Sequence, residues 1–128
     1  MNAAQSGNPI AMVIEDDEKL SMIYTQAMKL ADYHTLPFRD GQDAMESLEE
    51  VVPAVVVLDL NLPRISGETI LRKIRGDERY TKTKIIITTA NAALGSVLEE
   101  QSDLVLVKPV SFSQLRNLAE RLRMVIDQ

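Results

Sequence analysis

The sequence predicts an α/β domain in which a five-stranded parallel sheet lies between two layers of helices. Short runs of Val, Ile, Leu and Ala alternate along the whole chain with longer segments whose apolar residues recur at helical spacing. Strands that are apolar at successive positions are typical of parallel sheets that are buried on both faces. Because the crossovers between parallel strands are right-handed, few topologies remain possible.

Five segments are expected to form the strands, since each is short and apolar and ends at polar or turn residues. They cover residues 10–14, 33–38, 54–59, 84–89 and about 103–107. Pro53 marks the break before the third strand, and Lys108-Pro109 ends the fifth. The lone histidine, His34, falls in the second strand and is expected to be a surface or strand-end residue.

The segments between the strands are expected to be helices. They cover about 18–31, 40–50, 66–76, 93–101 and 111–126. Asp40 and Ser66 are expected N-caps, because their side-chain oxygens can accept from free N–H groups of the first turn. Two apolar stripes mark the first and the last helix. The stripes are Leu20, Ile23, Tyr24, Ala27 and Leu30, and Leu115, Leu118, Leu122 and Val125.

The composition limits the location and the class of partner. A chain of 128 residues fits one domain, with residues 1–8 as a flexible lead and residues 9–128 as the folded unit. No segment approaches the roughly 20 apolar residues that span a bilayer. The chain has no cysteine, which excludes disulfides and thiolate metal sites and favours a cytoplasmic location. A net charge of −5 argues against nucleic-acid binding.

Acidic residues end two of the expected strands. Asp59 closes the third strand, and Glu15 and Asp16 follow the first. Since the carboxyl ends of parallel strands meet at one edge of the sheet, these carboxylates are expected to converge there. The backbone carbonyl of Asn61 is expected to lie close enough to join them. Ligation by oxygen alone, with positions left for water, favours Mg²⁺.

The same edge is expected to carry two further polar groups, the Thr89 hydroxyl and the Lys108 ammonium. A carboxylate beside a divalent cation, a hydroxyl and a lysine can act as a nucleophile toward phosphorus. The cation, Thr89 and Lys108 would stabilise charge on the transferring phosphoryl oxygens. This pattern therefore indicates phosphoryl chemistry at Asp59.

Nearly the whole chain resembles the receiver domains of response regulators, the signalling proteins of two-component systems. Four motifs carry the resemblance, each at a strand end and in the family's order. They are Val13-Ile14-Glu15-Asp16-Asp17, Val57-Leu58-Asp59-Leu60-Asn61-Leu62-Pro63 with Gly67 beyond it, Ile87-Thr88-Thr89-Ala90, and Val107-Lys108-Pro109. The resemblance implies a flavodoxin-like (βα)₅ three-layer sandwich of the chemotaxis-regulator type.

The resemblance also implies a function. Asp59 would accept a phosphoryl group from a phosphohistidine on a sensor histidine kinase or a phosphotransfer protein, with Mg²⁺ as cofactor. Asp16, Asp59 and the Asn61 carbonyl would ligate the metal directly, and Glu15 would act through water. Thr89 and Lys108 would contact the phosphoryl group. The domain would catalyse its own phosphorylation and dephosphorylation without being an enzyme in the ordinary sense.

By the same resemblance, phosphorylation would switch the surface formed by the fourth helix, the fifth strand and the last helix. The protein would be a monomer or a phosphorylation-dependent homodimer, and the sequence does not identify its downstream target. Three features depart from the usual pattern: the acidic pair begins with Glu15, Val105 replaces a common aromatic, and the segment from Thr89 to Lys108 is shorter by roughly one helical turn.

Three alternatives remain open at the level of sequence. The first is a degenerate receiver that binds a protein partner independently of phosphorylation. The second is a phosphatase with an aspartyl nucleophile, although such enzymes usually carry a second Asp where this chain has Asn61. The third is a flavodoxin, although Glu15-Asp16-Asp17 would repel a flavin phosphate.

Overall fold

The computed structural model describes residues 7–127, so most of the expected lead over residues 1–8 lies outside the described residues. Five parallel strands form one sheet in the order β2-β1-β3-β4-β5. Their bounds are Ile10–Ile14 (β1), His34–Phe38 (β2), Val55–Asp59 (β3), Lys84–Thr89 (β4) and Leu104–Val107 (β5). His34 is half-buried at the first position of an edge strand, as expected.

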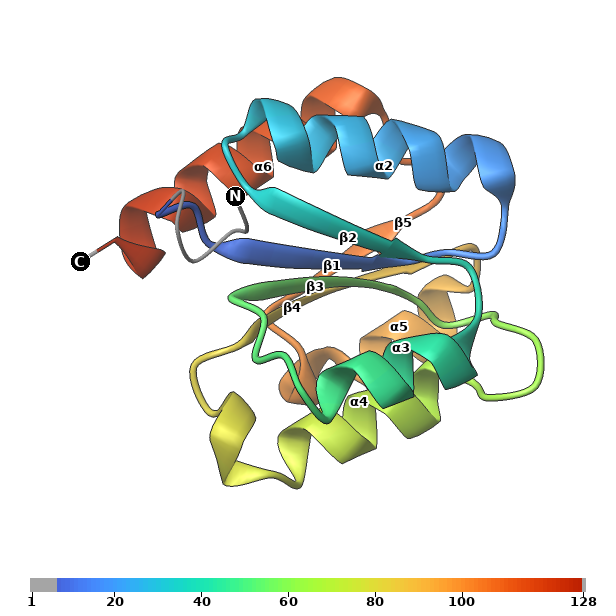
Figure 1. Ribbon diagram of the computed structural model, residues 1–128. Coiled ribbons are helices and arrows are strands. Elements are labelled where there is room, and N and C mark those ends of the chain that lie inside the picture. Colours follow the sequence, from blue (N-terminus) through green and yellow to red (C-terminus); the bar gives the residue numbers. More distant parts are fainter. Residues whose placement is uncertain (1–6, 128) are drawn as a thin grey trace.

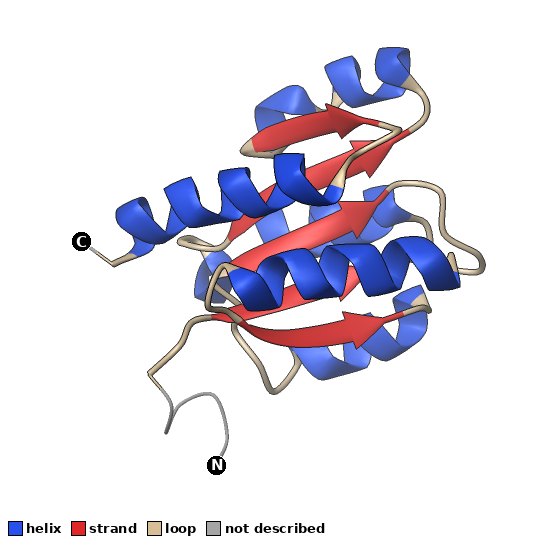
Figure 2. Ribbon diagram, turned by 90° about the horizontal axis from the view of Figure 1, so that it is seen from above, coloured by secondary structure: helices blue, strands red, loops and turns tan. Residues whose placement is uncertain are grey.

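Five α-helices cover the two faces of the sheet, and the predicted flavodoxin-like three-layer architecture is confirmed (Figure 1). Helices α2 and α6 lie together on one face, whereas α3, α4 and α5 lie on the other (Figures 1 and 2). Their bounds are Glu18–Leu30 (α2), Gly41–Leu48 (α3), Gly67–Arg75 (α4), Ala92–Val97 (α5) and Phe112–Ile126 (α6). None of the helices in the described part of the chain is long and apolar enough to cross a bilayer.

The central strand β3 shows why the sheet forms. All five of its residues are buried, because helices cover both of its faces. Val56 and Leu58 point into the core beneath α3, α4 and α5, and Val55 and Val57 point into the core beneath α2 and α6. Each fully buried side chain of this size contributes about 1.5–3 kcal/mol, so the uninterrupted apolar runs specify a strand between two layers.

Every α-helix begins at a side chain that accepts a hydrogen bond from the first turn. The caps are Asp17, Asp40, Ser66, Asn91 and Ser111. The expected caps Asp40 and Ser66 are confirmed. Such caps are each worth about 1 kcal/mol, and they place the start of each helix directly after the loop at the carboxyl end of a strand.

The structure corrects the expected apolar stripes of the first and last helices. Ile23, Leu30 and Val125 are exposed. Tyr24 and Ala27 of the expected stripe on α2 are buried together with Met28, and on α6 the expected Leu115 is buried together with Ala119. Apolar residues at helical spacing therefore identified only part of the buried face of each helix.

The segment expected to be one helix over residues 93–101 is divided. Helix α5 ends at Val97, and a separate 3₁₀ turn, η2 (Glu99–Gln101), follows it. A second 3₁₀ turn, η1 (Glu78–Tyr80), precedes β4. Strand β5 begins at Leu104 rather than at 103, because the Asp103 carboxylate accepts from the Ile85 N–H and pairs with Arg75.

Candidate functional site

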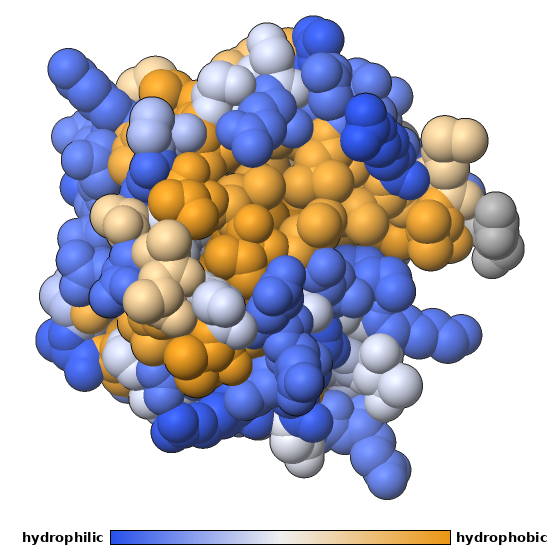
Figure 3. All heavy atoms as spheres, turned by 180° about the vertical axis from the view of Figure 1, so that it is seen from behind, coloured by the Kyte–Doolittle hydropathy of each residue, from blue (hydrophilic) through white to orange (hydrophobic). Residues whose placement is uncertain are grey.

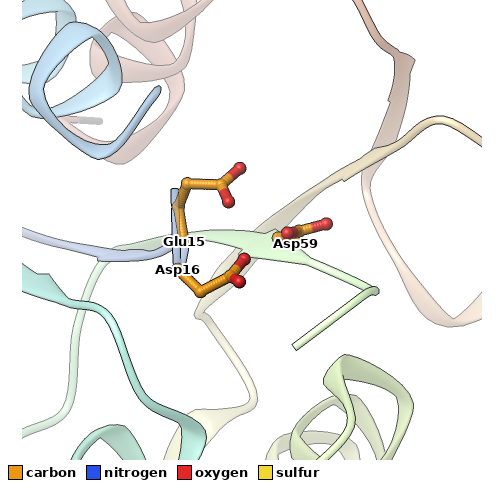
Figure 4. Close-up of side chains that lie close together, drawn as sticks. All are labelled: Glu15, Asp16 and Asp59. Atoms are coloured by element: carbon orange, nitrogen blue, oxygen red, sulfur yellow. The ribbon is translucent and has the colours of Figure 1, made fainter. Parts of the chain in front are cut away.

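Three carboxylates meet at the carboxyl edge of the sheet. Oxygens of Glu15, Asp16 and Asp59 all lie within 4.8 Å of one another (Figure 4). Strands β1 and β3 are neighbours, and the register pairs Ile14 with Leu58, so the residues that follow them come together. The convergence expected from the sequence is confirmed for these three side chains.

Lys108 neutralises part of this cluster. Its ammonium donates to Glu15 Oε1 at 2.9 Å and lies 3.5 Å from Asp59 Oδ2. The Lys108–Pro109 peptide is cis, and the Lys108 N–H donates to the carbonyl of Thr89 at 2.8 Å. The end of β5 is therefore attached to the end of β4, and the lysine crosses to the acids from there.

The second oxygen of each buried carboxylate is held by the backbone. Asp59 Oδ1 accepts from the Asn61 N–H at 3.1 Å, and Glu15 Oε2 accepts from the Asp17 N–H at 3.1 Å. Both residues are almost completely buried, with exposures of 2% for Asp59 and 1% for Glu15. Buried carboxylates need such partners, and these partners orient the remaining oxygens toward Lys108.

The pKa values reflect the balance of burial and charge. Burial raises the pKa of Glu15 to about 7, and Asp59 adds to this, whereas the Lys108 ammonium and the Asp17 N–H act in the opposite direction. Burial alone would lower the pKa of Lys108, but Glu15 and Asp59 outweigh it and raise that pKa above its usual value. Three carboxyl groups meet one ammonium at this edge, which favours an additional cation.

Thr89 lies at the end of β4, as expected, and is 3% exposed. Its hydroxyl accepts from the Asn91 N–H at 3.0 Å. Asn91 in turn caps α5 by accepting from the Leu94 N–H. The Thr89 hydroxyl therefore engages the loop before α5, and among the described residues it has no hydrogen bond to the acidic cluster.

The loop after Asp59 passes close to the site. The N–H of Gly67 donates to the Leu60 carbonyl, and a Cβ on Gly67 would lie 2.3 Å from the Asp59 carbonyl oxygen. Only glycine allows this approach. Arg64 in the same loop has a left-handed backbone, with φ of 63°, and pairs with Asp40. These contacts hold the start of α4 against the end of β3.

Two residues at the site carried no sequence signal. Arg39, at the end of β2, donates through Nε and Nη2 to the backbone carbonyl of Asp16 at 3.3 and 3.2 Å. Tyr24 appeared in the sequence only as a member of an apolar stripe, yet its hydroxyl is buried near the site charges. The spacing of apolar residues along a helix does not show which groups surround the hydroxyl of a tyrosine.

The donor set fits a hard divalent cation. Carboxylate oxygens from Glu15, Asp16 and Asp59 are grouped closely enough for one ion, and a single lysine faces these three acidic groups. Mg²⁺ is typically bound by a few carboxylates with water completing its octahedron. In the described part of the chain, this is the only such acidic group.

Comparison with known proteins agrees with the fold. The family model of the response regulator receiver domain matches residues 11–120. The transcriptional regulatory protein TrcR of Mycobacterium tuberculosis is 33% identical over 120 residues, which are 91% of this chain and 45% of that protein. The polar-differentiation response regulator DivK of Brucella ovis is 25% identical over 103 residues, 78% of this chain and 84% of that protein.

Among solved structures, the signal receiver domain of a putative LuxO repressor protein from Vibrio parahaemolyticus superimposes with a TM-score of 0.80 at 27% identity. It covers 93% of this chain and 95% of that chain. This chain spans less than half the length of TrcR, so the similarity concerns one domain of that protein. With its sheet order, its acidic cluster and its lysine, the chain belongs to the response regulator receiver domain family of two-component signalling.

Proposed function

We propose that this domain is a phosphoacceptor that takes a phosphoryl group onto Asp59 with Mg²⁺ as cofactor. The observation that carries the proposal is the placement of the Asp59 carboxylate, which is buried between the acidic pair Glu15-Asp16 and the Lys108 ammonium. Bound Mg²⁺ would supply charge neutralisation for the phosphoryl oxygens. Glu15, Asp16, Asp59 and the Asn61 carbonyl are the residues that would hold it, with Glu15 acting through water.

In the proposed reaction an Asp59 carboxylate oxygen forms a bond to phosphorus while the bond from phosphorus to a histidine nitrogen of the donor breaks. Lys108 stabilises the negative charge of the phosphoryl oxygens, and Thr89 contacts them after its hydroxyl leaves Asn91. Attack of water on phosphorus later breaks the bond to Asp59, which releases inorganic phosphate and returns the free carboxylate. The domain promotes both steps for itself, so it is a regulatory phosphoacceptor and not a conventional enzyme.

The phosphoryl donor is proposed to be a sensor histidine kinase or a phosphotransfer protein. The protein is proposed to be located in the cytoplasm. Residues 9–128 form the receiver domain, with residues 1–8 as its lead. Its acidic surface disfavours direct contact with nucleic acid or with a membrane. The downstream partner is a protein.

The output surface is proposed to be α5–β5–α6. Strand β5 pairs only with β4, and Val97, Val107 and Val125 of the three elements are exposed. The space-filling view from behind shows a broad apolar band on the molecule (Figure 3). Such a patch favours a protein contact, and the protein is proposed to be a monomer that forms a homodimer when phosphorylated.

A second candidate is a degenerate receiver that binds its partner without phosphorylation. The position that commonly holds an aromatic in the family is Val105, which is half-buried and packs against the core under α5. An aromatic side chain that would respond to movement of Thr89 is therefore absent from this position, which favours this alternative. The intact set of Glu15, Asp16, Asp59 and Lys108 favours the phosphoacceptor.

Intact mass measurement after incubation with acetyl phosphate and Mg²⁺ separates the two candidates. A phosphoryl adduct is expected that EDTA prevents and that Asp59→Asn abolishes. Asp43→Asn, which changes an exposed aspartate of α3, is the matched control and should keep the adduct. If neither acetyl phosphate nor a phosphorylated histidine donor produces an adduct, the degenerate binding module is the better description.

A further inference from the structure

Tyr24 stands apart from the other two tyrosines of this chain. All three are buried. The Tyr33 hydroxyl donates to the Ala119 carbonyl at 2.8 Å, and the Tyr80 hydroxyl donates to the Leu48 carbonyl. The Tyr24 hydroxyl has no hydrogen-bond partner among the described residues. Since buried polar groups are nearly always paired, an unpaired hydroxyl at a fully buried position needs an explanation.

The surroundings of Tyr24 place its phenol beside the functional site. Tyr24 extends from α2 into the cluster that contains Val13, Val57 and Val110. The first two residues lie in the strands that lead to Glu15 and Asp59, and the third follows Lys108-Pro109. Burial raises the pKa of Tyr24, and the strongest charge effects on it come from Lys108, Glu15 and Asp59, in that order. The phenol therefore stays protonated, and its cluster lies beneath the strand ends that carry the site.

Lys108 has a free donor for this hydroxyl. An ammonium carries three N–H groups. One is used by Glu15 Oε1 and a second is directed at Asp59 Oδ2. A phosphoryl group on Asp59 would draw the ammonium toward its oxygens, because they carry more negative charge than the free carboxylate, and would weaken the bond to Glu15. A neutral acceptor beside the lysine could then hold the third N–H.

We propose that Tyr24 is a positioning residue whose hydroxyl accepts a hydrogen bond from the Lys108 ammonium when Asp59 is phosphorylated, and so holds the lysine against the phosphoryl group. This inference rests on the proposed phosphoacceptor function. It assigns to the unpaired hydroxyl a partner, the third N–H of the ammonium, which comes within reach once phosphorylation draws the ammonium away from Glu15. It also explains why a tyrosine, rather than an aliphatic residue, occupies a core position of α2.

The test compares the wild-type protein with Tyr24→Phe and Tyr33→Phe. Each variant removes one buried hydroxyl from the same packed cluster. Beryllofluoride with Mg²⁺, a mimic of the aspartyl phosphate, is titrated while its apparent Kd and the Tm are measured. Tyr24→Phe should leave the Tm of the free protein unchanged or raise it, and should weaken beryllofluoride binding by about tenfold, the equivalent of one hydrogen bond to a charged group. Tyr33→Phe should lower the Tm and leave the Kd unchanged.

A second measurement reports on Lys108 directly. In protein labelled with ¹⁵N-lysine, the Lys108 ammonium signal should become slower to exchange on addition of beryllofluoride in the wild type and not in Tyr24→Phe. An equal Kd and an equal change of the ammonium signal in both proteins would overturn the role of Tyr24. If the wild type itself does not respond to beryllofluoride, the phosphoacceptor proposal fails, and the role of Tyr24 fails with it.

Discussion

The positive charge of Lys108 affects how tightly the acidic cluster can bind a metal ion. Its ammonium is within 3.5 Å of two carboxylates that would hold the cation. A cation bound by the same carboxylates would lie near the ammonium, and two unit positive charges about 4 Å apart repel each other by about 1 kcal/mol even in bulk water. The lysine that assists phosphoryl transfer therefore also competes with the metal.

Replacing Lys108 with Met should raise the affinity for Mg²⁺ several-fold, because the repulsion is removed while the carboxylates remain. Titration calorimetry of the two proteins at low ionic strength measures the change. Lys73→Met is the matched control, since Lys73 pairs with Glu49 on the surface, outside the acidic cluster. An unchanged or weaker affinity in Lys108→Met would mean that the ion binds away from the lysine.

Tyr33 provides a pH-dependent contribution to stability that is separate from the site. Burial raises its pKa to about 12, with Arg123 acting in the opposite direction. Between pH 10 and 12 the unfolded chain loses the phenolic proton while the folded chain keeps it, so the folded state binds more protons there. The free energy of unfolding should therefore fall as the pH rises through this window, by at most about 3 kcal/mol.

Denaturant unfolding at pH 9 to 12 tests this contribution. The wild type should lose more stability across the window than Tyr33→Phe, although the variant starts lower because it lacks the hydrogen bond to Ala119. Lysines that titrate in the same pH range contribute equally to both proteins, so the difference between their slopes of unfolding free energy against pH reports on Tyr33. Parallel curves for the two proteins would show that the buried phenol titrates at its ordinary value.

At the scale of elements, helix α5 packs against strands β4 and β5 through Gly95. A Cβ on Gly95 would lie 2.7 Å from Val105 Cγ1 and 3.1 Å from Thr89 Cγ2. The helix has six residues and rests on these two side chains through a glycine. Because Gly95 has no side chain, the Val105 side chain can pack directly against the backbone of α5.

Gly95→Ala should lower the free energy of unfolding by about 1–2 kcal/mol, because overpacking against a branched side chain outweighs the higher helix propensity of Ala. Chemical denaturation gives the change, with the exposed Ser96→Ala as control. The double variant Gly95→Ala/Val105→Ala should recover part of the loss, since the two positions are coupled. A stabilised single variant would show that α5 shifts freely.

At the scale of the whole molecule, the proposed metal ligands come from separate strands. Glu15 and Asp16 follow β1, whereas Asp59 ends β3, and the cluster exists only when the sheet is assembled. An ion that binds the folded chain alone stabilises it according to its concentration. Metal binding and global stability are therefore linked.

Mg²⁺ at about 100 times its Kd should raise the free energy of unfolding by about 2.7 kcal/mol. The thermal transition should shift upward with Mg²⁺ but not with NaCl of equal ionic strength. Asp16→Asn should reduce the shift, because one carboxylate of the cluster becomes neutral. A shift of equal size in that variant would place the ion outside the cluster formed by Glu15, Asp16 and Asp59.

The sequence by itself determined the order of strands and helices, the parallel sheet and the residues at its carboxyl edge. Apolar runs such as Val55-Val56-Val57-Leu58 are buried on both sides in only a few architectures, and the polar residue that follows each run must then lie at that edge. Glu15, Asp16, Asp59 and Lys108 could be identified as one group for this reason.

Only the tertiary structure decided which face of each helix is buried and what each polar atom reaches. Ile23 and Tyr24 are adjacent and belong to the same apolar pattern, yet Ile23 is exposed and Tyr24 is buried in the cluster with Val13, Val57 and Val110. Thr89 hydrogen-bonds to Asn91 rather than to the acids, and Gly95 packs on Val105. These contacts depend on how the helices pack across the sheet, which involves residues distant in the chain that a local sequence pattern does not describe.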